Sequence, residues 1–125
     1  GLIQLFLKVK LPYNLNAITQ KTGVRALGNV REAVEQIEQI ISERKRLESE
    51  LAVMDGIEIV SYSQANFILF RCREATTVFE KLFKQGIVIR DRGTQYGLQN
   101  CLRVSVGTPE ENDLFLAELR RSLYE

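Results

Sequence analysis

The sequence predicts an α+β fold: a small, mostly antiparallel sheet with helices on one face. Three observations predict this class. Apolar residues recur every three or four positions from Val30 to Leu51, which is typical of a long helix with one buried face. A strong helix start lies near the end of the chain, at residues 108–111. Between these features are four short apolar runs with the length of strands, at residues 57–60, 66–72, 87–90 and 101–106.

The first eleven residues form an apolar cluster that only three polar side chains interrupt. Natural chain ends are usually more polar than this. Two interpretations are open: an ordinary first helix or strand, or a segment cut from a larger protein. Pro12 ends the cluster, and Asn14 or Asn16 then caps a helix over residues 15–27.

The long helix presents its apolar stripe through Val30, Ala33, Val34, Ile37, Ile40, Ile41, Leu47 and Leu51. The spacing also fits a short coiled coil, but Arg44 interrupts the seam, so a helix that packs on its own domain is favoured. Asp55-Gly56 turns the chain into the strand at 57–60. The strand at 66–72 is apolar enough to lie in the centre of the sheet.

The second half of the chain is predicted to alternate helices and strands. A helix over residues 75–84 ends at Gly86, a favourable residue just past a last turn. A strand at 87–90, a polar loop at 91–100 and a strand at 101–106 follow. The helix over residues 75–84 is expected to have one apolar face, formed by Val78, Phe79, Leu82 and Phe83.

The last helix has the clearest start signal. Thr108 is the expected N-cap, Pro109 suits the first helical position, and Glu111 completes a capping box. Its buried stripe is predicted to consist of Leu114, Phe115, Leu119 and Leu123.

The composition excludes several classes of function. The 125 residues include 17 basic and 16 acidic side chains, a net charge of +1 that gives no broad positive field for nucleic acid. No apolar run is long enough to suggest a membrane span. The chain has no histidine, so the common catalytic triads and a metal-ligand motif are absent. Cys72 and Cys101 fall in predicted strands and are interpreted as buried thiols of a cytoplasmic protein.

Arg90 and Arg103 are the candidate binding residues, because each lies in or at the end of a predicted strand. Two guanidinium groups on adjacent strands would form a receptor for a phosphate ester or a carboxylate. Strand alternation turns both away from the face that the helices cover. The alternative is that the two arginines are solvated or pair with acidic neighbours, and the pattern alone favours it. These neighbours are Asp91, Glu110 and Glu111.

Three other segments carry weaker signals. The glycines of residues 93–97 do not have the spacing of a phosphate-binding loop, and a mobile connection is favoured. Residues 107–112 lead into a helix N-terminus, but two adjacent glutamates disfavour an anion, which favours a structural cap. Tyr13 has a hydroxyl that can bind a ligand, although such a tyrosine more often packs against a neighbouring helix.

Four motifs extend over nearly the whole chain: Lys10-Leu11-Pro12-Tyr13-Asn14-Leu15-Asn16, Ala65-Asn66-Phe67-Ile68-Leu69-Phe70, Gly86-Ile87-Val88-Ile89-Arg90-Asp91, and Cys101-Leu102-Arg103-Val104-Ser105-Val106-Gly107-Thr108-Pro109-Glu110-Glu111-Asn112. In order and spacing they resemble the C-terminal small domain of the histidinol-phosphate aminotransferases. These are fold-type I enzymes that depend on pyridoxal phosphate. The last motif is the most specific.

The resemblance implies that residues 1–125 are the substrate-side domain, with residues 1–28 a linker or helical segment toward an absent large domain. It implies that Arg103 binds the phosphate of histidinol phosphate in one half-reaction and a carboxylate of glutamate or 2-oxoglutarate in the other. Arg90 lies beside it in the same site. A planar guanidinium accepts either anion, which explains how one pocket serves both substrates.

The resemblance also places the cofactor lysine and the cofactor phosphate site in the large domain. We therefore expect no catalytic residue, no bound cofactor, no metal and no turnover in this chain alone. The parent is expected to be a cytoplasmic homodimer of histidine biosynthesis. Two alternatives stay open: a related enzyme that acts on aromatic amino acids or threonine phosphate, and a non-enzymatic binding or dimerisation module that uses the helix at 30–51.

Overall fold

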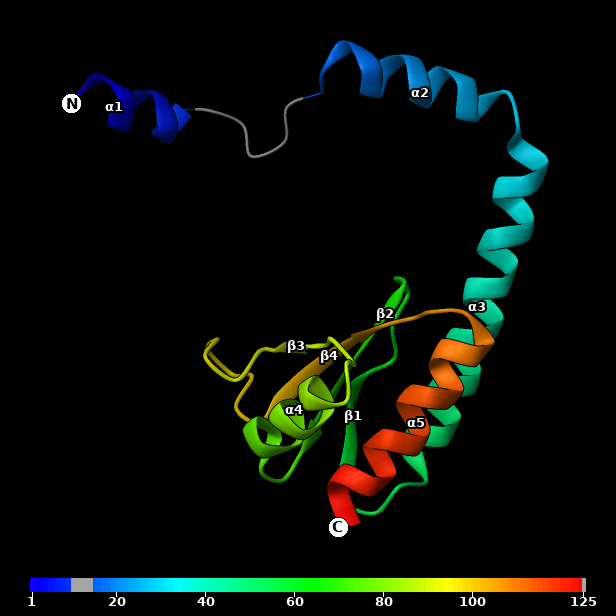
Figure 1. Ribbon diagram of the computed structural model, residues 1–125, viewed down its shortest axis with the longest axis vertical. Helices are drawn as coiled ribbons and strands as arrows, with labels where there is room; N and C mark the ends of the chain where they lie inside the picture. The colour runs from blue at the N-terminus through cyan, green and yellow to red at the C-terminus, as the bar shows by residue number, and fades with distance from the viewer. Residues whose placement is uncertain (10–14, 125) are drawn as a thin grey trace. The chain divides into compact units, whose positions relative to one another are not determined.

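A computed structural model describes residues 1–9 and 15–124 of the chain (Figure 1). The predicted stop at Pro12, the alternative cap Asn14 and the candidate hydroxyl of Tyr13 lie outside the described residues. The chain divides into two compact units, Gly1–Glu35 and Gln36–Glu125, and each is described by itself.

The first unit is helical. It contains α1 (Leu2–Val9), α2 (Ala17–Leu27) and the beginning of α3 (Val30–Ala52). The described part of the apolar cluster at the start of the chain, Leu2–Val9, therefore forms a helix rather than a strand. Asn16 is the N-cap of α2, as one of the two predicted alternatives has it, because its side-chain Oδ1 accepts a hydrogen bond from the Thr19 N–H at 2.8 Å. The apolar side chains of α1 and α2 are exposed.

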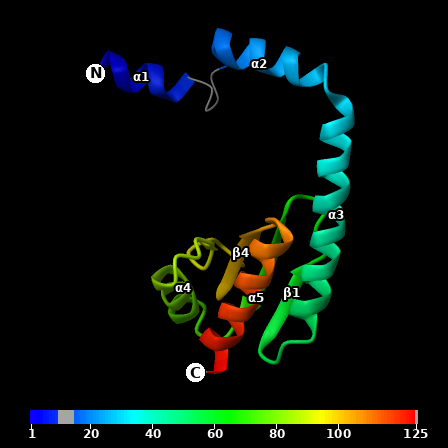
Figure 2. The ribbon, with the colours of Figure 1, turned by 45° about the vertical axis from the view of Figure 1, so that its right-hand side comes forward.

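The second unit confirms the predicted α+β class. After α3 come β1 (Ile57–Ser61), β2 (Phe67–Cys72), α4 (Ala75–Lys84), β3 (Arg90–Asp91), β4 (Cys101–Ser105) and α5 (Pro109–Tyr124). The four strands form one sheet in the order β1-β2-β4-β3, and every neighbouring pair is antiparallel. Figure 2 shows α5 in front of this sheet.

The core lies on one face of the sheet, and burial alternates along the central strands. On β2, Ile68, Phe70 and Cys72 are buried, while the intervening side chains are only half-buried. Leu102 and Val104 of β4 lie directly opposite Phe70 and Ile68 and extend the same buried face. Helices α3, α4 and α5 supply the other side of this core through Leu47, Leu51, Val78, Leu82, Phe115, Leu116 and Leu119. The opposite face of the sheet is called the open face below.

Three predicted apolar stripes are partly wrong. Phe83 is 59% exposed and stacks on Phe79, because the buried face of α4 turns toward Val78 and Leu82 instead. On α5, Leu114 is exposed and Leu116 is buried, so the stripe keeps Phe115 and Leu119 but is rotated slightly toward Leu116. On α3, only the last turns reach the core, so the apolar positions before Leu47 are exposed or half-buried, and the predicted continuous stripe is wrong there.

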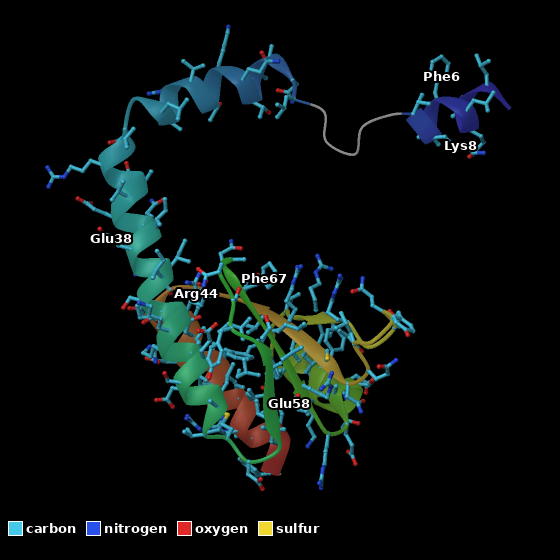
Figure 3. The ribbon with its side chains drawn as sticks, turned by 180° about the vertical axis from the view of Figure 1, so that it is seen from behind. Phe6, Lys8, Glu38, Arg44, Glu58 and Phe67 are labelled. Carbon is cyan, nitrogen blue, oxygen red and sulfur yellow. The ribbon has the colours of Figure 1, made fainter. Side chains whose placement is uncertain are left out.

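Arg44, the charged residue that interrupts this stripe, links α3 to the β1–β2 connection. Arg44 is only 8% exposed, and its Nη1 donates to the Ala65 carbonyl at 2.9 Å (Figure 3). One turn later, Glu48 accepts a hydrogen bond from the Ser63 N–H at 2.9 Å. Two buried charged side chains therefore hold the β1–β2 connection on α3 and fix the entry of β2.

The strand predicted at 87–90 is wrong in its bounds. The Ile87 N–H donates back to the Leu82 carbonyl at 3.0 Å, which closes the end of α4, and Gly86 adopts the positive φ of 81° that this ending requires. Residues 87–89 have no regular secondary structure and no ladder partner, and pairing begins only at Arg90. The turns of residues 92–100 then return the chain to β4.

The predicted capping box of α5 is confirmed. The Glu111 N–H donates to Thr108 Oγ1 at 3.3 Å, and the Thr108 N–H donates to Glu111 Oε2 at 2.8 Å. Asn112 adds a link that the sequence did not indicate. It is 2% exposed, accepts from the Gly107 N–H at 3.0 Å, and donates to Glu43 Oε2 at 2.8 Å. The end of β4 is thereby joined to both α5 and α3.

Candidate anion-binding site

The sheet brings the two predicted binding residues together. Arg90 of β3 and Arg103 of β4 are direct cross-strand partners. Directly opposed residues of an antiparallel pair point to the same face, with Cβ atoms about 4.5–5.5 Å apart. Leu102 and Val104, on either side of Arg103, point into the core, so the arginine pair projects from the open face. The prediction that both arginines leave the helix-covered face is confirmed in this geometry.

Arg103 is held on this face by an aromatic ring. Its guanidinium carbon lies 5.0 Å from the centroid of Phe67, which follows the β1–β2 connection. Its Nε is buried and has no hydrogen-bond partner. The Nη atoms are not buried, and they make no hydrogen bond or ion pair to the residues that the structure describes. The two Nη groups are therefore the donors of Arg103 that an anion can use.

A third arginine on the same face shows the contrasting state. Arg71 of β2 lies opposite Glu58 of β1, and its Nη1 donates to Glu58 Oε2 at 2.9 Å. Figure 3 shows Glu58 from the side opposite to the view of Figure 1. The hydrogen bond with Glu58 raises the pKa of Arg71 above its usual value. The charge of Arg71 is balanced by Glu58, whereas Arg90 and Arg103 have no acidic partner within residues 1–9 and 15–124.

The acidic neighbours that were alternative partners are engaged elsewhere. Asp91 Oδ1 accepts a hydrogen bond from the Gly93 N–H at 2.7 Å and so shapes the turn after β3. Glu111 is occupied in the capping box of α5. Glu110 forms no ion pair with either arginine. The geometry therefore favours two free cations over a pair of structural salt bridges.

The arrangement suits recognition of a dianion. Two guanidinium groups side by side offer charge-assisted hydrogen bonds to separate oxygens of one phosphate or carboxylate. The site is an open sheet face rather than a closed cleft. A cleft of about 610 Å³ lies between α4, the end of α5 and the turn at Asp55, and neither arginine lines it.

Phe67 is the residue that sequence reasoning missed. Its apolar character placed it in a buried strand, but the alternation of β2 puts it on the open face with Leu69 and Arg71. Strand alternation could have identified it, because Phe67 is one residue before Ile68 and three before Phe70, and therefore points to the opposite face from both.

The two cysteines are buried free thiols, as predicted. They lie on opposite faces of the sheet, Cys72 in the core and Cys101 beneath Arg71. Burial raises the pKa of the Cys72 thiol to about 11, so this group is neutral at ordinary pH. Neither thiol contributes to the arginine pair.

Across the residues that the structure covers, no helix is long and apolar enough to cross a membrane.

Comparison with known proteins gives a consistent result. The sequence pattern of the family described as aminotransferase class I and II matches residues 2–119. A histidinol-phosphate aminotransferase of Aquifex aeolicus is 40% identical over 93% of this chain. The crystal structure of the histidinol-phosphate aminotransferase from Clostridium acetobutylicum superposes with a TM-score of 0.77 at 27% identity over 91% of the chain. That of Sinorhizobium meliloti, in complex with pyridoxal-5'-phosphate, superposes with a TM-score of 0.76 at 26% identity over 96%.

The chain is much shorter than these proteins. It spans 33% of the Aquifex aeolicus protein, 35% of the Clostridium acetobutylicum chain and 33% of the Sinorhizobium meliloti chain.

Proposed function

Because this chain belongs to the family of class I and II aminotransferases, we propose that it supplies the substrate-binding arginines of a pyridoxal-phosphate-dependent aminotransferase. The observation that carries the proposal is the cross-strand pair of Arg90 and Arg103 on the open face. Two adjacent like charges without an acidic partner are unfavourable unless an anion joins them. An amino-group transfer between acidic substrates supplies such an anion at each half-reaction.

The substrates that we propose are histidinol phosphate and 2-oxoglutarate. Relatives named histidinol-phosphate aminotransferase, at 35–42% identity, support this choice. The phosphate of one substrate and a carboxylate of the other present oxygens at similar spacing to a planar guanidinium. The unpaired Nη groups of Arg103 therefore fit the anionic end of both substrates.

The open face does not fit the cofactor itself. Pyridoxal phosphate is attached to a lysine, and none of the four strands carries one. Cofactor binding and proton transfer at the reacting carbon are accordingly assigned to the part of such an enzyme that its longer relatives contain. We propose that this chain alone has no aminotransferase turnover.

We also propose that the parent protein is a cytoplasmic homodimer. In each subunit, this chain would contact a further, larger domain. The exposed apolar side chains of α1 support such a contact, because isolated surfaces seldom expose so many together. They are Leu2, Ile3, Leu5, Phe6, Leu7 and Val9.

Titration of the chain with inorganic phosphate tests the receptor directly. Arg103→Ala is expected to weaken binding about 10- to 100-fold, because charge-assisted hydrogen bonds are lost. Arg71→Ala is the matched control on the same face, and it should change the affinity less than about twofold because Arg71 is already paired with Glu58. Equal phosphate binding by wild type and Arg103→Ala would refute the receptor.

The substrate assignment needs the longer protein. The source reading frame upstream of Gly1 should encode a cofactor-binding domain, and the product of that frame should prefer histidinol phosphate to phenylalanine as amino donor. A preference for phenylalanine would assign the arginines to a related aminotransferase. A start codon near Gly1 would favour a free-standing binding module.

A further inference from the structure

We propose that Phe67 is a positioning residue that orders the guanidinium of Arg103 for anion binding. The inference rests on the proposed function, because it names the residue that prepares the same receptor. It starts from one contact: the Arg103 guanidinium carbon lies 5.0 Å from the Phe67 ring centroid. A cation within about 6 Å of an aromatic ring centre is attracted by the electron density of the ring face.

The register of the sheet explains why these two residues meet. Leu69 of β2 is the direct partner of Arg103, and Phe67 is the direct partner of Ser105. Phe67 therefore lies on the diagonal to Arg103, at a spacing that only large side chains bridge. Ser105 is small and exposed, so it leaves room beside the ring. A ring at position 67 thus covers one side of Arg103.

The position of Phe67 is itself fixed by the fold. The preceding residue, Asn66, accepts a hydrogen bond through its carbonyl from the Val106 N–H at 2.8 Å. The carbonyl of Ala65 accepts from Arg44 of α3. Figure 3 labels Arg44 and Phe67 at this end of β2. The backbone just before Phe67 is therefore hydrogen-bonded both to α3 and to the residue after β4. These hydrogen bonds fix the position of the ring beside Arg103.

The contacts of Arg103 indicate how the Phe67 ring affects its guanidinium. The Nε atom is buried and unpartnered, whereas the Nη atoms are free. With the Phe67 ring on one side, the guanidinium has fewer positions open to it, and its two Nη groups stay unpaired for an anion. An arginine side chain otherwise loses much rotamer freedom when it binds. Ordering before binding lowers this cost, which is how preorganisation raises affinity.

The arginine pair also benefits electrostatically. Arg90 is exposed and has no ring contact, so the two cations differ in how they are held. The ring face offsets part of the repulsion between the two guanidinium groups by attracting one of them. We infer that Arg103 is the ordered member of the receptor and that Arg90 adjusts to the anion.

The test compares phosphate titrations of the 125-residue chain with four variants. Phe67→Leu removes the ring and keeps an apolar side chain, and it is expected to weaken phosphate binding about 2- to 30-fold. Phe67→Tyr keeps the ring and should restore affinity to within about twofold. Phe83→Leu is the matched control, because Phe83 is an exposed ring on α4 away from the receptor. Arg103→Ala gives the loss of affinity expected when this guanidinium is absent.

A second measurement separates positioning from a general effect on folding. The ¹⁵N relaxation and the ring-shifted resonance of the Arg103 Nε–H report the order of this side chain without any ligand. Phe67→Leu should make this group mobile and move its resonance, while Phe67→Tyr and Phe83→Leu leave both unchanged. Thermal unfolding of each variant checks that the fold persists at the titration temperature.

The outcomes distinguish the two proposals. If Arg103→Ala loses binding while Phe67→Leu binds phosphate as wild type does, with an unchanged Nε–H signal, the positioning role is refuted and the receptor stands. If wild type and Arg103→Ala bind alike, the receptor itself is refuted, and the positioning role fails with it. A weakened Phe67→Leu that Phe67→Tyr does not rescue also contradicts a role for the ring.

Discussion

Replacing Arg90 with glutamine is expected to stabilise the fold and to weaken phosphate binding in the same molecule. Arg90 lies directly opposite Arg103 in the β3–β4 ladder, and neither has an acidic partner in the described chain. Like charges directly opposite each other on neighbouring strands are destabilising. Removing one of them relieves that repulsion and breaks no ion pair, but it also removes half of the receptor.

The magnitude follows from the position of the pair. Two unit charges about 4 Å apart interact by about 1 kcal/mol in water, and the interaction falls as they separate. Arg90 is exposed, so its side chain can turn away and lower the repulsion. We expect Arg90→Gln to raise the free energy of unfolding by about 0.2–1 kcal/mol. Loss of one charge-assisted contact should weaken phosphate binding by about 10-fold.

The assay is urea unfolding of wild type and variant at low and high salt, with a phosphate titration of each. At 1 M salt the screening length is about 3 Å, so the gain in stability should disappear there. Arg71→Gln is the control on the same face. It breaks the pair with Glu58 and should lower stability at low salt instead of raising it.

Two results would refute this reasoning. If Arg90→Gln destabilises the chain as Arg71→Gln does, Arg90 has an attractive partner rather than a repulsive one. If phosphate affinity is unchanged in Arg90→Gln, the arginine at position 90 does not belong to the receptor.

Three further predictions concern buried side chains in β2 and beside β4. Asn112→Ala should lower the free energy of unfolding by about 3 kcal/mol, because the Glu43 carboxylate and the Gly107 N–H lose a buried partner. Asn112→Asp places a second carboxylate beside Glu43, whose pKa the Arg46 hydrogen bond holds below its usual value, so its cost should be larger at pH 7 than at pH 4; equal cost at both would contradict it. For Cys72, the folded-state pKa of about 11 lies above the unfolded value of about 9, so its contribution is complete below pH 9 and is lost as pH rises toward 11. The stability difference between wild type and Cys72→Ala should fall by about 2–3 kcal/mol over that range, and a flat difference would show that the thiol is not buried from solvent.

The sequence predicted helix boundaries correctly where interactions between residues a few positions apart determine them. The capping box at Thr108 and Glu111 needs only a spacing of three residues, and the structure has it. The ends of α4, at Ala75 and Lys84, were also predicted to the residue. At the start of α5 and at the C-terminal end of α4 the backbone groups are satisfied within one turn, so no distant partner is needed to set these boundaries.

The errors lie where a distant partner decides. The run at 87–90 has the composition of a strand, but only Arg90 and Asp91 have ladder partners on β4. The apolar stripe of α3 continues well beyond the turns that reach the core. A stripe shows that a face can be buried, and it does not show what covers it. Arg44 is the converse case, since a charged residue is buried because a carbonyl of the β1–β2 connection meets it.

The same distinction applies to the receptor. Alternation along β4 was enough to place Arg103 on the open face, because it is a property of one strand. The pairing with Arg90 needs the order β2-β4-β3, and the contact with Phe67 needs the register of β2 against β4, in which neighbours are far apart in the sequence. Whether an arginine is free depends further on where every nearby acid is engaged, as the contrast between Arg71 and Arg103 shows. A pair of arginines in a sequence is therefore weak support for an anion site, whereas a pair that shares one sheet face, lacks acidic partners and has one member held by a ring is strong support. We expect that combination to lower the stability of the unliganded fold, and the anion binding that we propose would be the physical reason to retain it.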